Sequence, residues 1–321
     1  MGMWFKNLQV FNFTEKFTMT AEVLGQQLAD HAFREVMAGE QQSKGWVSPQ
    51  GEEDLPLVHA ANGFMLLCLR VQEKMVPATV VREILAERIS LLEEREGRKV
   101  YKKEKERLKD EIFYELLGRA FSRNHRIYGC IDLVDGNLWV DTASSKKAEL
   151  FTTELRRALG TLKIQLPQVM NVPIILTDWV HSKKLPAEFV VLDSFVIEDV
   201  KTGGVLRGQK QEVFSDDIQS LFDGSRSVIQ LGLSWCDLVS VVLKQDFSMK
   251  SLKFLQDIKA EASDIFTETA AQKFDADFTL MTETLRNFWR SIYGVFKADQ
   301  SSVPSSGVRV LSGSTESVGV E

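Results

Sequence analysis

The sequence is poor in cysteine, and its cysteines are not paired. Cys68, Cys130 and Cys236 are the only three among 321 residues, and none belongs to a Cys-x-x-Cys motif. This spacing gives no sign of a disulfide framework. Their neighbours in the segments MLLCLRV, IYGCIDL and LSWCDLV are mainly apolar, so we expect buried free thiols and a reducing compartment.

Long apolar runs and targeting signals are absent as well. No uncharged apolar run approaches the ~18 residues that a membrane-spanning helix needs. The N-terminal segment MGMWFKNLQVFNF has no basic stretch followed by an apolar one, so we expect no export. These features favour a cytoplasmic protein without a membrane partner.

The sequence also lacks the motifs of common enzyme sites. It contains no Walker A loop, no Gly-x-Gly-x-x-Gly and no Gly-x-Ser-x-Gly elbow. Its four histidines show neither His-x-His nor His-Glu-x-x-His spacing; they are His31, His59, His125 and His181. We therefore predict a non-enzymatic protein with no cofactor and no metal site.

What the sequence does contain is the composition of an ordinary globular protein. Apolar residues make up 44% and charged residues 26%, with a formal net charge of −6. A chain of this length can bury a substantial core, and its length favours about two domains. A net charge of this size neither requires nor excludes a local basic surface.

The first half of the chain reads as strands, then helices, then a hairpin. Apolar alternation in segments 4–13 and 63–76 predicts strands, and Pro77 ends the second of them. Two amphipathic helices with narrow apolar stripes follow, over 81–92 and 108–117, interrupted at Gly97. Their dense charge predicts a helical pair that projects from the body.

Strand and helix signals alternate irregularly through the rest of the chain. Asp135-Gly136 predicts a β-hairpin, and segment 145–160 predicts a helix ended by Gly160. Further strands are expected in 186–200, 203–214 and 227–244. Two closing helices are then expected, one carrying Leu252, Leu255 and Ile258 and the other spanning 278–292. This order indicates an α+β protein.

The predicted domains follow from these elements. We expect a central α+β domain in 1–76 and 119–170, a projecting helical tip in 77–118, and a second α+β domain in 171–298. The remaining segment, 299–321, is rich in Ser, Gly and Val without periodicity, so we expect a disordered tail.

One segment collects positive charge in an acidic protein. Residues 95–109 contain eight Lys and Arg against three Glu, and Lys99, Lys102, Lys103 and Lys105 fall close together in helical phase. The ordinary interpretation is a solvated helix with ion pairs four residues apart. From this segment alone, that interpretation is favoured.

Further clusters of basic residues without acidic neighbours favour a binding surface over a solvated helix. A basic face would attract nucleic acid by releasing counterions, with strong salt dependence and little sequence preference. Flanking Gly and Ser residues let backbone N–H groups approach phosphate as well. The clusters are Arg119, Arg123, His125 and Arg126; Lys146 and Lys147; Arg156 and Arg157; and Arg207 and Lys210.

Two other features have alternative interpretations. Phe121 lies between Arg119 and Arg123, where it can belong to the core, to a contact with another subunit, or to a surface that stacks on bases. The pair Asp275 and Asp277 suits a metal-dependent nuclease. It suits equally a helix N-cap and first turn, with Asp275 as the cap, and we favour the second account.

A series of short motifs in order resembles the bacterial recombination-associated RdgC family over residues 3–298. The motifs include MWFKNLQVF, GWVSP, HAANG, LKDEI, RAFSR, VDTASSKKAE, LRRALGTL, LTDWV, GGVLRGQKQ, LSWCDLVSVVL, LKFLQDI and FDADFTLMT. Each motif alone is only weakly specific for the family, whereas the ordered set of motifs is specific. The resemblance does not cover the tail.

The resemblance implies an elongated, horseshoe-like subunit that closes as a ring-shaped homodimer around double-stranded DNA. It also implies sequence-independent DNA binding, with single-stranded DNA as a further ligand, antagonism of RecA-dependent recombination, and a place on the nucleoid. Phe121 then belongs to one dimer contact, and Lys210 and Gln211 to the other; Gln209 stands where the family often has lysine. The DNA-binding candidates are Lys99, Lys102, Lys103, Arg119, Arg123, Arg126, Lys146, Lys147, Arg207 and Lys210.

Two alternatives from other classes stay open. One is a metal-dependent nuclease centred on Asp275 and Asp277. The other is a protein-interaction scaffold that contacts RecA without DNA.

Overall fold

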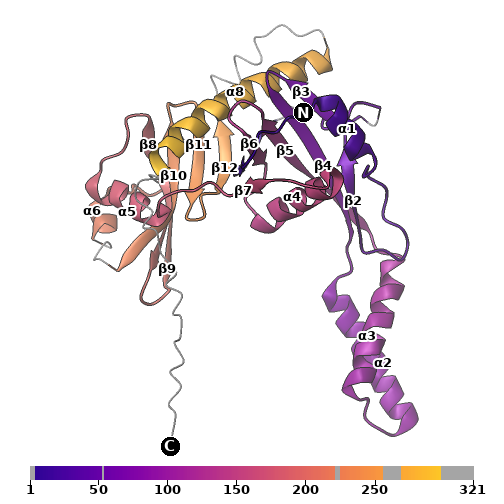
Figure 1. Cartoon of the computed structure of the whole chain (residues 1–321). Coiled ribbons are helices and arrows are strands. Elements are labelled where there is room, and N and C mark those ends of the chain that lie inside the picture. The colour runs from indigo at the N-terminus through magenta and orange to yellow at the C-terminus, as the bar shows by residue number, and fades with distance from the viewer. Residues whose placement is uncertain (1–3, 53, 221–224, 256–268, 298–321) are drawn as a thin grey trace, which may run out of the picture.

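The computed structural model describes residues 4–52, 54–220, 225–255 and 269–297. The predicted tail lies outside these residues, as does Ile258. Two antiparallel sheets, several helices and a helical pair make up the fold, which confirms the α+β class (Figure 1). No helix in the part of the chain that the structure describes is long and apolar enough to cross a membrane.

The first sheet has seven strands in the order β2-β4-β5-β6-β1-β7, with β3 also paired to β4. Strands β5 and β6 form the hairpin predicted at Asp135-Gly136, and Gly136 adopts the positive φ of 66° that this turn needs. The strands are β1 (Gln9–Phe13), β2 (Gln42–Val47), β3 (Val58–Ala61), β4 (Phe64–Lys74), β5 (Ser122–Asp132), β6 (Asn137–Val140) and β7 (Ile164–Gln165).

Two helices cover one face of this sheet. They are α1 (Ala21–Ala29) and α4 (Ser145–Leu159), and they pack on Leu67, Leu69, Ile127 and Ile131. Gly129 of β5 is required for the approach of α4, because a Cβ there would lie 2.2 Å from the Phe151 ring. Gly160 ends α4 with a φ of 74°, as expected for a C-cap glycine.

The second sheet has five strands in the order β12-β11-β10-β8-β9. Helix α5 (Val172–Ser182) packs on it, and the short helix α6 (Asp216–Gln219) follows β9 along the chain. The strands are β8 (Phe189–Asp199), β9 (Val205–Gln209), β10 (Arg226–Trp235), β11 (Val239–Lys244) and β12 (Met249–Phe254).

The N-terminal segment and the last helix join the two sheets. Backbone groups of Leu8 and Met249 exchange two hydrogen bonds of 2.9 Å, which connects the segment before β1 to β12. Helix α8 (Ala270–Phe296) runs across the same side of both sheets (Figure 1). Its Phe278 packs near Phe64 of the first sheet, and its Trp289 near Phe247 beside the second. One core cluster therefore extends through both sheets.

The helical pair predicted between the first strands and the hairpin is present. Helices α2 (Ala78–Glu96) and α3 (Lys102–Leu117) extend away from the rest of the molecule (Figure 1). Gly97 separates them in the left-handed conformation, with φ 64°. The domain boundaries drawn from the sequence stay predictions.

Three expectations were wrong. Leu252 lies in strand β12 rather than in a helix, because its neighbours alternate between core and solvent. Asp275 is not an N-cap: Thr269 caps α8, and its hydroxyl accepts a hydrogen bond from the Gln272 N–H. Cys236 is exposed, because it lies in the turn between β10 and β11 with φ 48°.

Candidate nucleic-acid interface

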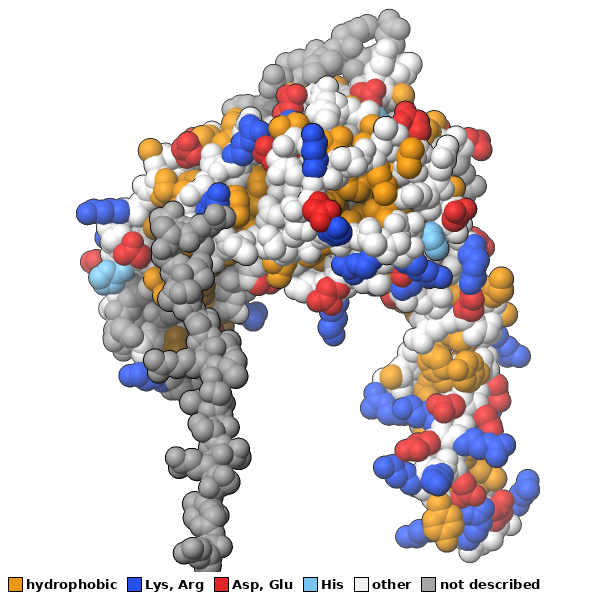
Figure 2. Space-filling model, viewed as in Figure 1, with side chains coloured by type: hydrophobic (Ala, Val, Ile, Leu, Met, Phe, Trp, Pro, Cys, Tyr) orange, Lys and Arg blue, Asp and Glu red, His pale blue; other side chains and the backbone are white. Residues whose placement is uncertain are grey.

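The sheet surfaces that face away from α8 carry several of the predicted basic residues. Residues alternate between the two faces of a strand, so every second side chain of β5 points away from α8. In β5 these are Arg123, His125, Ile127 and Ile131, on the side where α4 packs. Figure 2 shows Lys and Arg side chains along the lower side of the body and on the projecting helices.

Two sequence clusters meet on this side of the first sheet. Lys147, in the first turn of α4, acts electrostatically on His125 of β5, as does Arg123. Burial lowers the pKa of His125, and Lys147 and Arg123 lower it further, while Glu73 opposes them. Two cations next to a partly buried imidazole form a region that a phosphate would neutralise.

Arg126 lies on the other side of the sheet. It is three residues from Arg123, an odd number, so the two side chains leave β5 on opposite faces. Of the two predicted DNA-binding arginines in this segment, Arg123 shares a surface with Lys147 and Arg126 does not. A strand cannot present an RNHR segment on a single side.

The second sheet has its own basic groove, also on the face away from α8. Arg207 of β9, Lys250 and Lys253 of β12, and Lys210 line a hollow of about 560 Å³, together with the carboxylate of Asp193. Burial lowers the pKa of Lys250, and Lys244 and Arg207 lower it further. The Lys250 ammonium donates a hydrogen bond to Gln230 Oε1 over 2.6 Å.

Lys244, Lys250 and Lys253 were not among the residues predicted from the sequence. Lys250 and Lys253 are in a segment predicted to be helical, whereas the structure places them in strand β12. The signal was weak: Leu252 and Phe254 alternate with polar residues, but two polar residues separate Met249 from Leu252, where the pairing with β11 shifts register. Lys244 is the least available of the three, since its ammonium lies 3.0 Å from Asp246 Oδ2.

We call these groups the basic face. It comprises residues of both sheets and α4 that point away from α8: Arg123, His125, Lys147, Arg207, Lys210, Lys244, Lys250 and Lys253.

The helical pair divides its charges between ion pairs and unpaired lysines. Arg88, Arg98 and Arg107 form salt bridges with glutamates, which is the ordinary solvated arrangement. Within the described ranges, no carboxylate lies within salt-bridge distance of five lysines: Lys99, Lys102, Lys103, Lys105 and Lys109.

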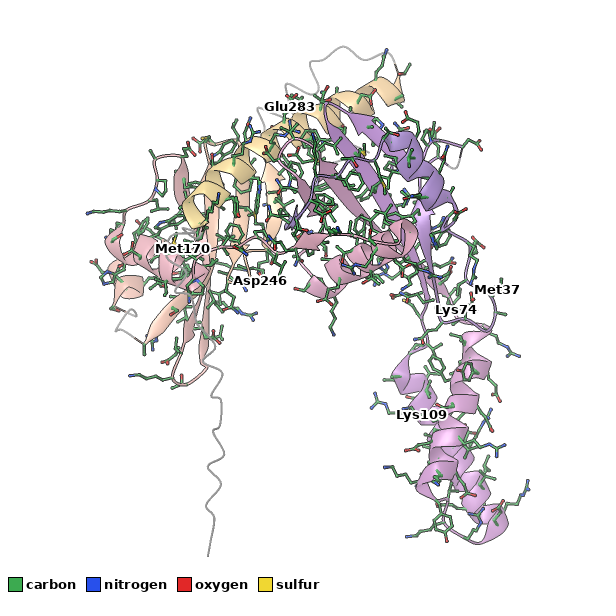
Figure 3. The ribbon with its side chains drawn as sticks, viewed as in Figure 1. Met37, Lys74, Lys109, Met170, Asp246 and Glu283 are labelled. Carbon is green, nitrogen blue, oxygen red and sulfur yellow. The ribbon has the colours of Figure 1, made fainter. Side chains whose placement is uncertain are left out.

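Three of these lysines share one side of α3. Lys102, Lys105 and Lys109 are spaced i, i+3 and i+7, so they follow one stripe, whereas Lys103 lies about a quarter-turn away. Lys109 is marked part-way along the helical pair in Figure 3. The solvated, ion-paired interpretation therefore accounts for the three arginines, and a binding role for the lysines stays a prediction.

Phe121 does not belong to the core of this chain. Its side chain is 86% exposed, at the junction between the helical pair and β5. Met75 is 53% exposed, and its N–H donates to the Phe121 carbonyl; Met37 is 62% exposed and lies next to Lys74, as Figure 3 shows. Met75 and Phe121 are paired across the ends of β4 and β5, so their two side chains form an exposed apolar pair.

The other predicted contact motif lies in the second sheet. Lys210 directly follows β9 with a φ of 54°, and the Gln211 N–H donates to the Asp193 carbonyl over 3.3 Å. Gln209, Lys210 and Gln211 are all exposed. The two motifs are therefore carried by different sheets.

Asp275 and Asp277 do not converge. They are two residues apart on α8, a spacing at which side chains point to different sides. Asp275 Oδ1 lies 3.0 Å from His59 Nε2, while Asp277 is buried, which raises its pKa. Among the residues with described positions, no three His, Cys, Asp or Glu side chains come close enough to share a metal ion.

Comparison with known proteins shows which family the chain belongs to. The family model described as "Putative exonuclease, RdgC" matches residues 3–299. The chain belongs to the RdgC family. The resemblance drawn from the ordered motifs is confirmed over nearly the whole chain.

Curated RdgC relatives also align with this chain over most of its length. The recombination-associated protein RdgC of Aeromonas hydrophila is 37% identical over 303 residues, covering 94% of this chain and 100% of the relative. The proteins of the same name from Yersinia pestis and Yersinia pseudotuberculosis are 39% identical over 286 residues, covering 88% of this chain and 94% of each relative. The names of these relatives refer to recombination, whereas the family description refers to an exonuclease.

Proposed function

We propose that this protein binds DNA without sequence preference through the basic face and restrains recombination by occupying the duplex. The supporting observation is the position of the cations. Side chains from β5, α4, β9, β11 and β12 lie on the surfaces that face away from α8. A surface of Lys and Arg contacts phosphates, which are the same for every sequence.

The secondary structure around these cations supports phosphate contact over base reading. The cations come from strands and from the first turn of α4, whose N-terminal backbone N–H groups also favour phosphate. Base reading requires several side chains that reach base edges in a groove. The cations are spread over both sheets and α4 instead, as expected of a protein that follows the DNA backbone.

The same proposal includes a homodimer. A horseshoe-like subunit whose two ends both self-associate closes as a ring, with one self-complementary contact at each end. The exposed pair of Met75 and Phe121 supports one such contact, because an exposed phenylalanine next to an exposed methionine gains from burial. Lys210 and Gln211 are the candidates for the second contact.

Antagonism of RecA follows from occupancy of its substrate. A duplex enclosed by the ring is not available for strand exchange, so no direct contact with RecA is required. The basic lysines of α3 extend the proposed DNA path toward the end of the helical pair. Nucleoid association follows from DNA binding without sequence preference.

The test is binding to two unrelated duplexes of equal length, measured by fluorescence anisotropy at several salt concentrations. Affinities that agree within a few-fold and fall steeply with salt support the proposal. An affinity that is flat between 50 and 200 mM salt contradicts it. Absence of DNA retention at low salt, together with retention of RecA, would favour the scaffold.

The nuclease alternative has its own assay, because the family model carries an exonuclease description. End-labelled DNA is incubated with the protein and Mg²⁺ or Mn²⁺. Cleavage that Asp277→Asn abolishes would support this alternative. Cleavage that persists in Asp277→Asn would place catalysis elsewhere.

A further inference from the structure

A second basic site lies on the opposite side of the first sheet. Arg70 of β4 and Arg126 of β5 are direct cross-strand partners, so their side chains leave the sheet side by side on one face. This face is opposite to the one that carries Arg123 and His125. The two arginines therefore lie outside the basic face.

Like charges directly opposite each other destabilise a sheet, so this pair requires an explanation. Salt bridges to protein groups do not provide one. In the described part of the chain, no carboxylate lies within salt-bridge distance of either guanidinium. The hydrogen-bond partner of Arg70 is neutral: its Nε donates to Asn124 Oδ1 over 3.3 Å.

Cys68 and Tyr128, the two ionisable side chains that interact with these arginines, stay neutral. Burial raises the pKa of Cys68 to about 12, although Arg126 and Arg70 oppose the shift. Burial also raises the pKa of Tyr128, which is in contact with Arg126. Neither the thiol nor the phenol supplies a negative charge at neutral pH.

The two guanidinium groups border a hollow of about 290 Å³. Its walls include the segments 32–33 and 46–48, together with Gly51, Glu52 and Leu57. Gly51 has φ 95°, and a Cβ there would lie 3.4 Å from Arg126 Nη1, so its backbone passes close to the guanidinium. Glu52 is the single carboxylate of the described lining, against two arginines.

The hollow favours a small anion over a base. Arg70 covers the Phe33 ring, with its guanidinium carbon 4.2 Å from the ring centre, and Trp46 is only 1% exposed. Stacking with a base needs an open ring face, which neither aromatic side chain offers. The Nη groups of Arg70 have no acceptor among the described residues, and paired guanidinium groups suit the oxygens of phosphate.

We propose that Arg70 and Arg126 form a binding site for a phosphate group on the side of the first sheet opposite to the basic face. The phosphate offsets the repulsion between the two arginines and accepts hydrogen bonds from both. Free phosphate esters and the phosphates of nucleic acid share this chemistry.

The experiment uses the full-length protein in phosphate-free buffer and inorganic phosphate as the probe. Phosphate is expected to raise the midpoint of thermal unfolding more than sodium chloride does at equal ionic strength. Arg126→Gln is expected to lose this response and to weaken phosphate binding about tenfold or more by calorimetry. Arg82→Gln, an exposed arginine on α2 outside both sites, is expected to keep it.

Arg126→Gln is expected to fold, because it removes a like-charge pair. Its midpoint of thermal unfolding without phosphate should be unchanged or higher than that of the wild type. Arg70→Gln gives the second variant, with loss of the phosphate response again expected. A wild-type response no larger than that to chloride overturns the proposal. A response retained in both variants does so as well.

Competition experiments identify the source of the phosphate. A deoxynucleoside 5′-monophosphate that matches inorganic phosphate points to phosphate esters, and a blunt duplex that displaces the probe points to nucleic acid. The proposed DNA function is tested separately. The double variant Lys147→Gln/Lys250→Gln is expected to lose duplex affinity and to keep the phosphate response.

Discussion

The salt dependence of DNA binding can be predicted from the basic face. Among its Lys and Arg side chains, we take Arg123, Lys147, Arg207, Lys250 and Lys253 as the phosphate contacts of one subunit. Lys244 is left out because Asp246 neutralises it, and Lys210 because it is a candidate for the second dimer contact. Five phosphate contacts give a slope of log affinity against log salt of about −4.5. Affinity should then fall about 500-fold between 50 and 200 mM salt.

The perturbation is the double variant Lys147→Gln/Lys250→Gln, which removes one cation from each sheet region. The remaining three contacts give a slope of about −2.7 and a loss of about 40-fold over the same salt range. Glutamine keeps the polarity and most of the length of the side chain, so the fold is expected to persist. The assay is fluorescence anisotropy with a labelled duplex across that range.

The control is Lys273→Gln, an exposed lysine on α8 that lies away from the basic face. It should leave the slope at the wild-type value. A slope that is the same in the double variant and in the wild type would refute the reasoning. A slope that falls equally in Lys273→Gln would mean that net charge, rather than the basic face, governs binding.

Three further predictions concern single-residue variants, and the last compares two of them. Phe121→Ser should leave the free energy of unfolding within about 0.5 kcal/mol, because the side chain is exposed, and should weaken self-association in sedimentation experiments; an unchanged dimer would argue against that contact. His125→Gln should remove part of the rise in DNA affinity as the pH falls from 7 to 5.5. The lowered pKa of His125 keeps the ring neutral at pH 7. The free protein loses stability as the pH falls from the ordinary histidine pKa to this lowered one, whereas in the complex the protonated ring adds a phosphate contact. Asp132→Ala should lower the free energy of unfolding by about 3–5 kcal/mol in urea titrations, because it leaves Arg286 of α8 without its buried partner. Asp135→Ala breaks a more exposed pair with Arg290 and should cost about 1 kcal/mol or less; equal losses would contradict this account.

Local sequence signals predicted most of the elements. The apolar stripe of 278–292, the Asp135-Gly136 turn and the cap at Gly160 each depend on residues close together in the chain, and all three are confirmed. The joining of the two sheets was not predictable in this way. It depends on Leu8 and Met249, which are 241 positions apart and have no local pattern that pairs them.

Lys250 and Lys253 show a different limit of prediction from sequence. The segment after β11 contains Leu252 and Leu255, whose spacing of three suits a helix as well as a strand followed by a turn. The structure resolves this through tertiary contacts, because the Leu252 N–H donates to the Lys6 carbonyl at the N-terminus. Once β12 is a strand, Lys250 and Lys253 join Arg207 in the groove.

The RNHR segment shows why charge clusters in sequence do not translate directly into surfaces. On a helix, Arg123 and Arg126 would share a side, since residues three apart are neighbours there. On strand β5 the same spacing sends them to opposite faces. Arg123 then joins Lys147 on the basic face, while Arg126 meets Arg70 beside the hollow near Gly51. One short basic segment therefore supplies two separate anion-binding candidates, and a variant of either arginine tests one of them without removing the other.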